Sequence, residues 1–241
     1  MYNLEDVTKL PEDFNGQVRL FPLPNLVVFP HAMQPLHIFE PRYVEMLRDS
    51  ATTDRLIAMA TLTPLGGPKW PTGQPPIAPT VCIGRILSHS EVESSKYNLL
   101  LVGIRRARMV AEIESGKPYR LGQVEMIDDS DELTANDSSQ RLKAKLLDAF
   151  GSVMPVGQSV QQNLQQLMSD QMGLGAITDI VGYTLPFSVE EKLELLQESS
   201  VKTRAEFLIS RISEGGVTFN SDGKSEQQSP AKDFPPRFSN N

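Results

Sequence analysis

The side chains that most often carry catalysis or bind metals are few in this sequence and do not cluster. Cys82 is its only cysteine, and its histidines are His31, His37 and His89. His31 and His37 lie six positions apart in a proline-containing stretch, a spacing that matches no metal-ligand pattern. A single cysteine forms neither an internal disulfide nor a multi-cysteine zinc site. The sequence therefore predicts no metal site and no cofactor.

The motifs of common enzyme mechanisms are also missing from the sequence. No GxxxxGK[ST] loop is present to hold the phosphates of a nucleotide, and no GxSxG motif marks a serine nucleophile. Catalytic triads can also assemble from residues far apart in the sequence, and local motifs do not detect them. We expect a protein without catalytic residues rather than an ATPase or a hydrolase.

Three arginines close together form a basic segment in the middle of the chain. Arg105, Arg106 and Arg108 lie in an apolar run expected to be a strand, where alternation places Arg106 and Arg108 on one face. This pair is the candidate for contacts with phosphates. The alternative is a solvated face whose arginines pair with carboxylates such as Glu112 or Glu125.

Two aromatic features are candidates for contacts with a polypeptide. The segment HIFEPRY, residues 37–43, places Phe39 and Tyr43 at an expected turn from strand to helix. This segment is either a buried structural corner or an exposed recognition edge. Trp70 lies in a loop rich in proline and glycine, residues 63–80, where it is either half-buried or part of an exposed apolar lip. Phe39, Tyr43 and Trp70 are the predicted polypeptide-binding residues.

Strand patterns position these residues in the first half of the chain. From Val18 to about Ile127, short apolar runs are broken by proline and glycine, which favours strands and turns. Leu26–Phe29 is expected to pair in a sheet, and two long β segments are expected to flank a turn at residues 93–96. A short helix is expected to begin at Pro41.

The second half of the chain has the apolar spacing of helices. Ser188 and Glu191 fit a capping box that opens one of them, and Gly215 with Gly216 is expected to end the last. Residues 215–241 are polar with scattered prolines and are expected to be a disordered tail, either inert or carrying a docking motif. The apolar stripes cover residues 142–150, 160–168, 174–185, 189–196 and 201–212.

Length and charge limit the kinds of protein that fit. A chain of 241 residues makes one large domain or two small ones. Residues 15–127 hold 12 basic and 9 acidic side chains, whereas residues 128–214 hold 7 basic and 14 acidic ones, and no dense basic block suits duplex binding. No stretch has the length and hydropathy of a membrane helix, and the start lacks the pattern of a signal peptide. We expect a cytoplasmic protein that does not enter a membrane.

Several segments together resemble one family. VRLFPLPNLVVFPHAMQPLHIFEPRYVEML, residues 18–47, is similar to the opening of the Lon protease amino-terminal domain, and PLHIFEPRY is typical of its stand-alone relatives. CIGRI at 82–86 and LLLVGIRRARM at 99–109 resemble two strands of that domain, with Gly103, Arg106 and Arg108 on the motif positions. Residues 175–209 resemble its helical portion, where the matching positions include Asp179 and Arg204.

The resemblance implies a fold and a division of the chain. The implied fold class is α+β, with a β pseudo-barrel of the type shared with RNA-binding PUA domains followed by a helical bundle. The expected parts are an amino-terminal extension at 1–16, the β domain at 17–128, the helical bundle at 129–214 and the tail at 215–241. The ATPase and Ser/Lys peptidase modules of Lon proteases are expected to be absent from this chain.

The leading functional hypothesis is a non-catalytic protein that binds flexible or unfolded polypeptide, as an adaptor in protein quality control. The resemblance supports it, since this region engages substrates in Lon proteases. The alternative is an RNA-binding PUA-like module, which the acidic net charge of −7 disfavours. A small-molecule pocket between barrel and helices is a third reading. Polypeptide substrates or partner proteins are the expected partners, a nucleic acid or a membrane is not, and the sequence defines no oligomeric state.

Overall fold

The computed structural model of the protein contains a group of strands followed by a group of helices. Its described residues are 8–63, 75–130, 136–154, 161–162, 166, 168–170 and 172–215. The strands are β1 (Gln17–Leu23), β2 (Met33–Ile38), β3 (Leu56–Thr61), β4 (Thr80–Glu93), β5 (Lys96–Ile113) and β6 (Arg120–Ile127). The helices are α2 (Pro41–Ala51), α3 (Asn136–Val153), α5 (Leu174–Thr184), α6 (Val189–Gln197) and α7 (Val201–Ser213). The predicted α+β fold class is confirmed.

The strands close into a barrel from which β2 extends. The sheet order is β2-β5-β4-β3-β1-β6, and a further pairing of β5 with β6 joins the ends of the last five strands. The β1–β3 pair is parallel and the other pairs are antiparallel. β5 has 18 residues, so its different parts can pair with β2, β4 and β6. Among the described strands β2 pairs only with β5, which makes it an edge strand.

Two apolar cores hold this architecture together. One fills the barrel and includes Leu20, Ile83 and Ile104. The other lies between the outer surface of the sheet and the helices, and it includes Phe29 and Val181. The helical half is therefore packed onto the barrel through a continuous apolar interface.

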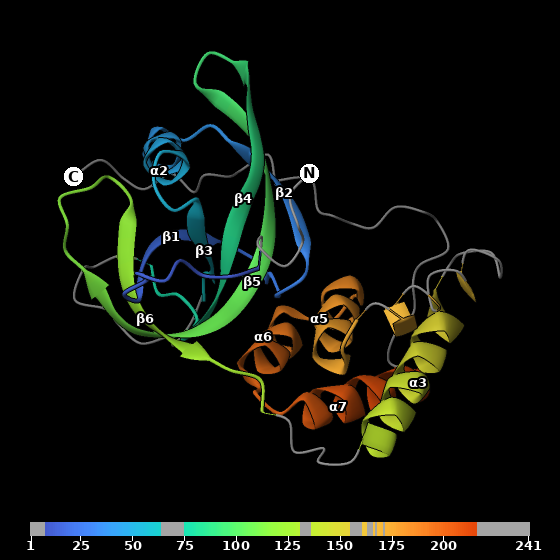
Figure 1. Ribbon diagram of the computed structural model, residues 1–241. Coiled ribbons are helices and arrows are strands. Elements are labelled where there is room, and N and C mark those ends of the chain that lie inside the picture. The colour runs from blue at the N-terminus through green and yellow to red at the C-terminus, as the bar shows by residue number, and fades with distance from the viewer. Residues whose placement is uncertain are drawn as a thin grey trace.

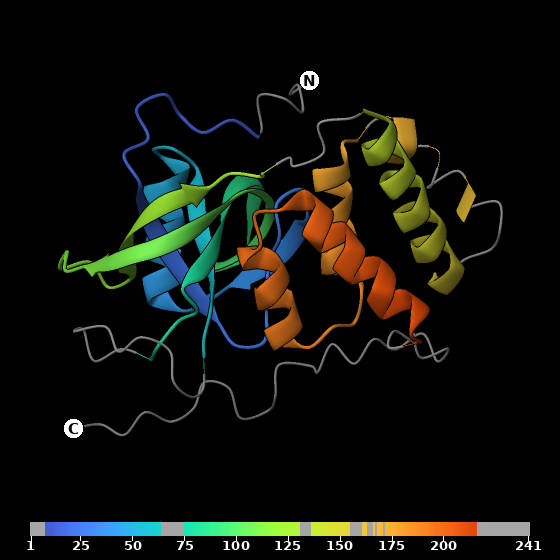
Figure 2. The ribbon, with the colours of Figure 1, turned by 90° about the horizontal axis from the view of Figure 1, so that it is seen from below.

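The helices lie on two sides of the barrel. Figure 1 shows α2 on one side, and α5, α6 and α7 grouped on another. In the view from below, α6 lies next to the barrel and α3 lies farthest from it (Figure 2). Helix α3 packs mainly against α7, whereas α6 touches β4 and β5. Helices α5, α6 and α7 therefore lie between the barrel and α3.

Most sequence predictions of individual elements are confirmed. Helix α2 begins at Pro41, and the turn between β4 and β5 falls at residues 94–95. The Ser188 hydroxyl accepts a hydrogen bond from the Glu191 amide, and the Glu191 carboxylate accepts one from the Ser188 amide, which is the predicted capping box. The division at residues 128 and 129 stays a prediction. The stripe at 160–168, the loop around Trp70 and nearly all of the tail lie outside the described residues.

The prediction of a strand at Leu26–Phe29 is wrong. Val27, Val28 and Phe29 are buried and Leu26 is half-buried, all without regular structure, and the chain that follows crosses β5 closely. His31 N–H donates to the Gly103 carbonyl at 2.8 Å, and Gly103 N–H donates to the Ala32 carbonyl at 2.9 Å. A Cβ at Gly103 would overlap the carbonyl oxygen of Phe29, so only glycine fits at this crossing.

No helix among the described residues combines the length and the apolar character needed to cross a lipid bilayer.

The crossing at Gly103 predicts a large stability difference between two glycine substitutions. Gly103→Ala is expected to lower the free energy of unfolding by several kcal/mol, about 2–4, because either β5 or the buried 27–32 segment must move. Gly173→Ser is the control, since a Cβ at Gly173 meets nothing within 4 Å and serine suits its position at the start of α5. Urea denaturation followed by circular dichroism measures both. Equal stability of the two variants would contradict the close approach.

Candidate functional site

The two described aromatic candidates occupy different environments. Phe39 directly follows β2 and is 50% exposed. Tyr43, on α2, is only 5% exposed, and its ring centroid lies 4.5 Å from that of Phe21. The prediction of Tyr43 as a polypeptide-binding residue is therefore wrong, because its ring is part of the core. Trp70 lies outside the described residues, and its role stays a prediction.

The two arginine candidates are also separated. Arg108 is largely exposed and pairs with Glu125 at 3.0 Å, as the solvated-face alternative predicted. Arg106 is only 3% exposed, because the helices cover this part of the outer face of β5. A surface contact with phosphate through Arg106 is therefore wrong for this structure.

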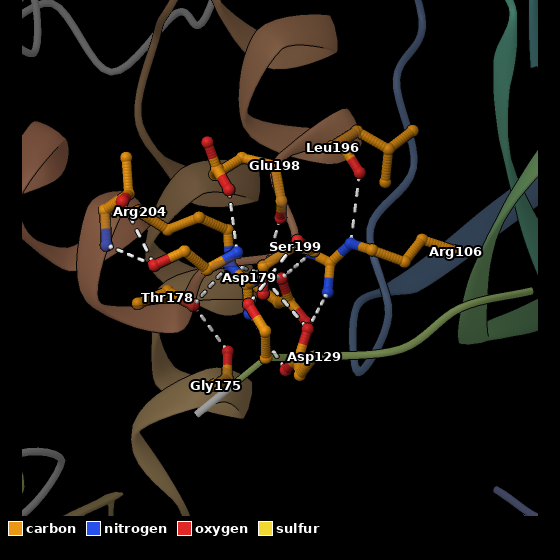
Figure 3. Close-up of polar contacts among 12 residues, drawn as sticks. Arg106, Asp129, Gly175, Thr178, Asp179, Leu196, Glu198, Ser199 and Arg204 are labelled. Atoms are coloured by element: carbon orange, nitrogen blue, oxygen red, sulfur yellow. Dashed lines mark hydrogen bonds and ion pairs between the residues drawn. The ribbon is translucent and has the colours of Figure 1, made fainter. Parts of the chain in front are cut away.

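Arg106 instead reaches into a cluster of charges that is buried except at Asp129, whose side chain is 38% exposed. Its Nη1 lies 2.6 Å from Asp129 Oδ1, and its Nη2 lies 2.5 Å from Asp179 Oδ1. Its Nε donates to the backbone carbonyl of Leu196 at 3.0 Å. Figure 3 shows this guanidinium entering the cluster from the side of β5. Each of the three nitrogens of this buried guanidinium therefore has a partner, as a buried charge requires.

A second arginine enters the same cluster from α7. Arg204 contacts both carboxylate oxygens of Asp129, each at 2.9 Å. Its Nε donates to Thr178 Oγ1 at 3.1 Å, and its Nη1 donates to the Glu198 carbonyl at 2.8 Å (Figure 3). Arg204 is 1% exposed. Two arginines and two aspartates therefore form one compact charge-balanced group, which we call the charge cluster.

The members of the charge cluster come from four places in the sequence. Arg106 lies on β5, Asp129 follows β6, Asp179 lies on α5 and Arg204 lies on α7. A Cβ at Gly175 would collide with the Asp129 carboxylate, so this glycine lets α5 approach. These ion pairs join side chains of the barrel to side chains of the helices, so they hold the helices in one position on the barrel.

The environments of the two carboxylates shift their pKa values in opposite directions. Burial raises the pKa of Asp179 to about 6, against the charges of Arg106 and Arg204, which lower it. Burial alone would also raise the pKa of Asp129, but hydrogen bonds and charge from Arg204 and charge from Arg106 bring it below its ordinary value. Both carboxylates are therefore ionised at pH 7. Because the folded-state pKa of Asp179 is raised, its ionisation lowers the free energy of unfolding as pH rises from about 4, the pKa in the unfolded chain, to about 6. Because the folded-state pKa of Asp129 is lowered, its ionised carboxylate stabilises the fold above about pH 4, and this stabilisation is lost as pH falls below that value.

On the side of β2 that faces away from the second core, the sheet has an exposed surface. Alternation places Met33, Pro35 and His37 together on one face of β2. Met33 is 56% exposed, and the ring centroids of His37 and Phe39 lie 5.9 Å apart. Only four large apolar side chains are exposed among the described residues, and Met33 and Phe39 are two of them.

This surface is hollowed between β2, β5 and β4. The hollow measures about 520 Å³, with Leu100 and Pro35 as apolar members and Asn98 as a polar one. His37 Nδ1 and Asn98 Oδ1 are 2.9 Å apart and hydrogen-bonded. We call this surface, together with its flanking apolar side chains, the open face; its residues are Met33, Pro35, His37, Phe39, Ser88, Ser90, Asn98 and Leu100. Apolar side chains beside hydrogen-bonding groups are typical of surfaces that bind other chains.

A second hollow of about 960 Å³ lies between residues 11–19, the end of α2 and the start of β6. It is lined mostly by polar and charged residues that already pair with one another. Arg19 pairs with Asp54 at 2.8 Å, and Lys117 pairs with Asp49, also at 2.8 Å. This is not the apolar cavity that the small-molecule reading required.

The single cysteine, Cys82, is buried in the sheet and lines neither hollow. Burial raises the pKa of the Cys82 thiol, which keeps it in the unreactive protonated form. No group of three or more histidine, cysteine, aspartate or glutamate side chains within the described residues is arranged to hold a metal ion. The geometry supports binding through surface contacts.

Comparison with known proteins identifies similar chains. The family model described as "ATP-dependent protease La (LON) substrate-binding domain" matches residues 17–214. The Lon protease of Syntrophus aciditrophicus is 24% identical over 204 residues, which is 82% of this chain and 24% of that protein. Lon protease 1 of Bacillus subtilis is 23% identical over 203 residues, 84% of this chain and 26% of that protein. The chain therefore spans about a quarter of the length of these relatives.

Solved structures show the same fold. A Lon N-terminal domain protein from Xanthomonas campestris superposes with a TM-score of 0.58 at 24% identity, over 80% of this chain and 97% of that one. The N-terminal domain of a Mycobacterium avium complex Lon protease gives 0.63 at 16% identity, over 82% and 98%. Both comparisons cover the barrel and the helices together.

The charge cluster predicts that two arginines on one strand differ in their effect on stability. Arg106→Met is expected to lower the free energy of unfolding by about 3–5 kcal/mol, because Asp179 loses its closest partner while still buried. Arg108→Met, with the same change on the same strand, is expected to alter it by no more than about 0.5 kcal/mol. Chemical denaturation of the two variants measures the difference.

A double variant separates the charge from the packing. Arg106→Met combined with Asp179→Leu is expected to recover part of the stability lost in the single variant, since the unpaired carboxylate is gone. If the double variant has a lower free energy of unfolding than Arg106→Met alone, the loss in the single variant does not come from the unpaired Asp179 carboxylate.

Proposed function

The chain belongs to the family of Lon protease substrate-binding domains, and on that premise we propose that it binds flexible or unfolded polypeptide through the open face. The family supports a substrate-binding role. The binding site and the role of an adaptor in protein quality control, without catalysis by this chain, are the proposed parts.

The observation that carries the proposal is the exposure of Met33 and Phe39 at the two ends of one β2 face. Apolar side chains of this size gain about 1.5–3 kcal/mol each on full burial, so their exposure favours a partner that covers them. The hollow between them offers the polar groups of His37 and Asn98 beside the apolar surface of Leu100. Such a mixture can bury an apolar side chain and hydrogen-bond a nearby peptide group.

Two of the three arginines that motivated the RNA-binding alternative already have partners within the protein, whereas the third, Arg105, is exposed. Arg106 is buried, and the charge of Arg108 is already paired with Glu125. A phosphate ligand would have to compete with these carboxylates.

The proposal predicts that apolar truncations on the open face weaken binding. Met33→Ala and Phe39→Ala are each expected to reduce affinity for a fluorescently labelled unfolded protein about tenfold, corresponding to ~1.4 kcal/mol. Val110→Ala is the matched control, since Val110 is 48% exposed on the part of β5 that pairs with β6. Fluorescence anisotropy titration gives the affinities. If the control weakens binding as much as the two test variants, the site is placed wrongly.

Salt dependence distinguishes the two functional classes. Affinity for polypeptide is expected to change less than about twofold between about 50 and 200 mM salt, because the open face binds through apolar burial. A steep loss of affinity over the same range, together with tight binding of single-stranded RNA, would favour the RNA-binding alternative instead.

A further inference from the structure

The outer edge of β2 is open among the described strands. β2 pairs with β5 along its whole length, from Met33 opposite Val102 to Ile38 opposite Tyr97, and it is the last strand in the sheet order. An open edge of this kind commonly binds a peptide as an added strand, through backbone hydrogen bonds. Because the open face adjoins this edge, a polypeptide could bind either by adding a strand to β2 or by side-chain contacts with the open face.

The hydrogen bond made by Ala32, the residue before β2, shows which β2 backbone groups face β5 and which face the open edge. The Ala32 carbonyl accepts a hydrogen bond from Gly103 N–H of β5, so Ala32 points toward β5. In an antiparallel pair, alternate residues point toward and away from the partner strand. Gln34 and Leu36 therefore point toward β5, and the odd-numbered residues Met33, Pro35 and His37 point outward.

At the centre of this outward edge the backbone has no donor, and its acceptor is already hydrogen-bonded. Pro35 has no backbone N–H, and its carbonyl accepts a hydrogen bond from Gln34 Nε2 at 2.7 Å. The Gln34 side chain is in turn fixed by Tyr183 of α5, whose hydroxyl donates to Gln34 Oε1 at 2.8 Å. The Tyr183 hydroxyl oxygen also lies 3.5 Å from the Met33 carbonyl oxygen. An added strand would find no donor at Pro35 and would have to displace or share the Gln34 hydrogen bond to the Pro35 carbonyl. Tyr183 lies beside the Met33 carbonyl.

The remaining outward groups are too far apart to form a continuous ladder. Met33 and His37 are four residues apart, about 13 Å along a strand. Met33 and Phe39, the exposed apolar ends of the open face, are six residues apart, or about 20 Å. The strand therefore exposes apolar side chains, whereas its backbone cannot form a continuous hydrogen-bond ladder with an added strand. We call this the closed edge.

Resting on the proposed function, we propose that the open face captures polypeptide through side chains and adds no strand to β2. The partner is a flexible segment with two bulky apolar side chains about six residues apart, which reach Met33 and Phe39 while the chain between them lies over the hollow. Recognition of this kind depends on the spacing of apolar side chains and not on the backbone N–H groups of the partner.

Backbone methylation of a synthetic peptide tests this proposal. The probe is a labelled peptide of about twelve residues in a Gly/Ser/Asn background, with two phenylalanines six positions apart. Two further versions carry N-methyl groups at alternate residues, one for each edge of the peptide. Both are expected to bind the full chain within about threefold of the parent, and replacement of either phenylalanine by alanine is expected to cost about tenfold. A loss of tenfold or more in one methylated version only would show strand addition and overturn the proposal.

An opened variant provides the matching control on the protein. Gln34→Ala combined with Pro35→Val frees the carbonyl and restores an N–H at the centre of the edge. This variant is expected to bind the parent peptide more tightly than the wild-type chain, and to lose that gain with one methylated peptide. Equal affinity of the wild-type and opened chains for all three peptides would overturn the role of the closed edge.

The same titrations distinguish failure of this inference from failure of the proposed function. If the labelled unfolded protein binds but the parent peptide does not, the proposed spacing is wrong while polypeptide binding stands. If neither binds, the proposed function itself is wrong.

Discussion

The charge cluster is the interaction on which the arrangement of this protein depends. Arg106 and Arg204 are almost completely buried, and a buried arginine cannot lose its charge within the pH range of proteins. Each therefore needs a carboxylate, and the carboxylates of Asp129 and Asp179 come from different parts of the chain. Separation of the helices from the barrel would leave Arg106 without Asp179 and Leu196. The two halves are thus expected to move as one body under native conditions.

The position of α5 connects this interior cluster to the surface. Asp179 and Tyr183 lie four residues apart on α5, one helical turn, so the ion pair that holds Asp179 also sets the place of Tyr183. Tyr183 holds Gln34, and Gln34 occupies the carbonyl of Pro35. Gly182 on the same helix packs beside Phe29, which the crossing at Gly103 holds in place. The open face is therefore bordered by α5, and the ion pair of Asp179 and the packing of Gly182 fix the position of this helix.

Local chemistry made much of the fold predictable. Pro41 at a helix start, the Ser188–Glu191 capping box and the polar turn between β4 and β5 each depend on neighbours in the sequence, and each prediction is confirmed. Long-range contacts decided the rest. Alternation placed Arg106 on the correct strand, but whether helices cover that strand depends on residues more than 70 positions away. The signal for the cluster was the family resemblance, in which Arg106, Asp179 and Arg204 are matching positions. Met33 was missed as a surface residue because methionine is usually buried and its exposure depends on which elements cover β2.

Binding at the open face is tested most directly by a map of backbone amide chemical shifts at saturation with an unfolded polypeptide. The largest changes are expected on β2 and on the neighbouring residues of β4 and β5, at 33–39, 88–90 and 98–100, with small changes on α7. Largest changes around the polar hollow near Arg19 and Lys117, or on the outer surface of the helices, with the open face unaffected, would contradict it.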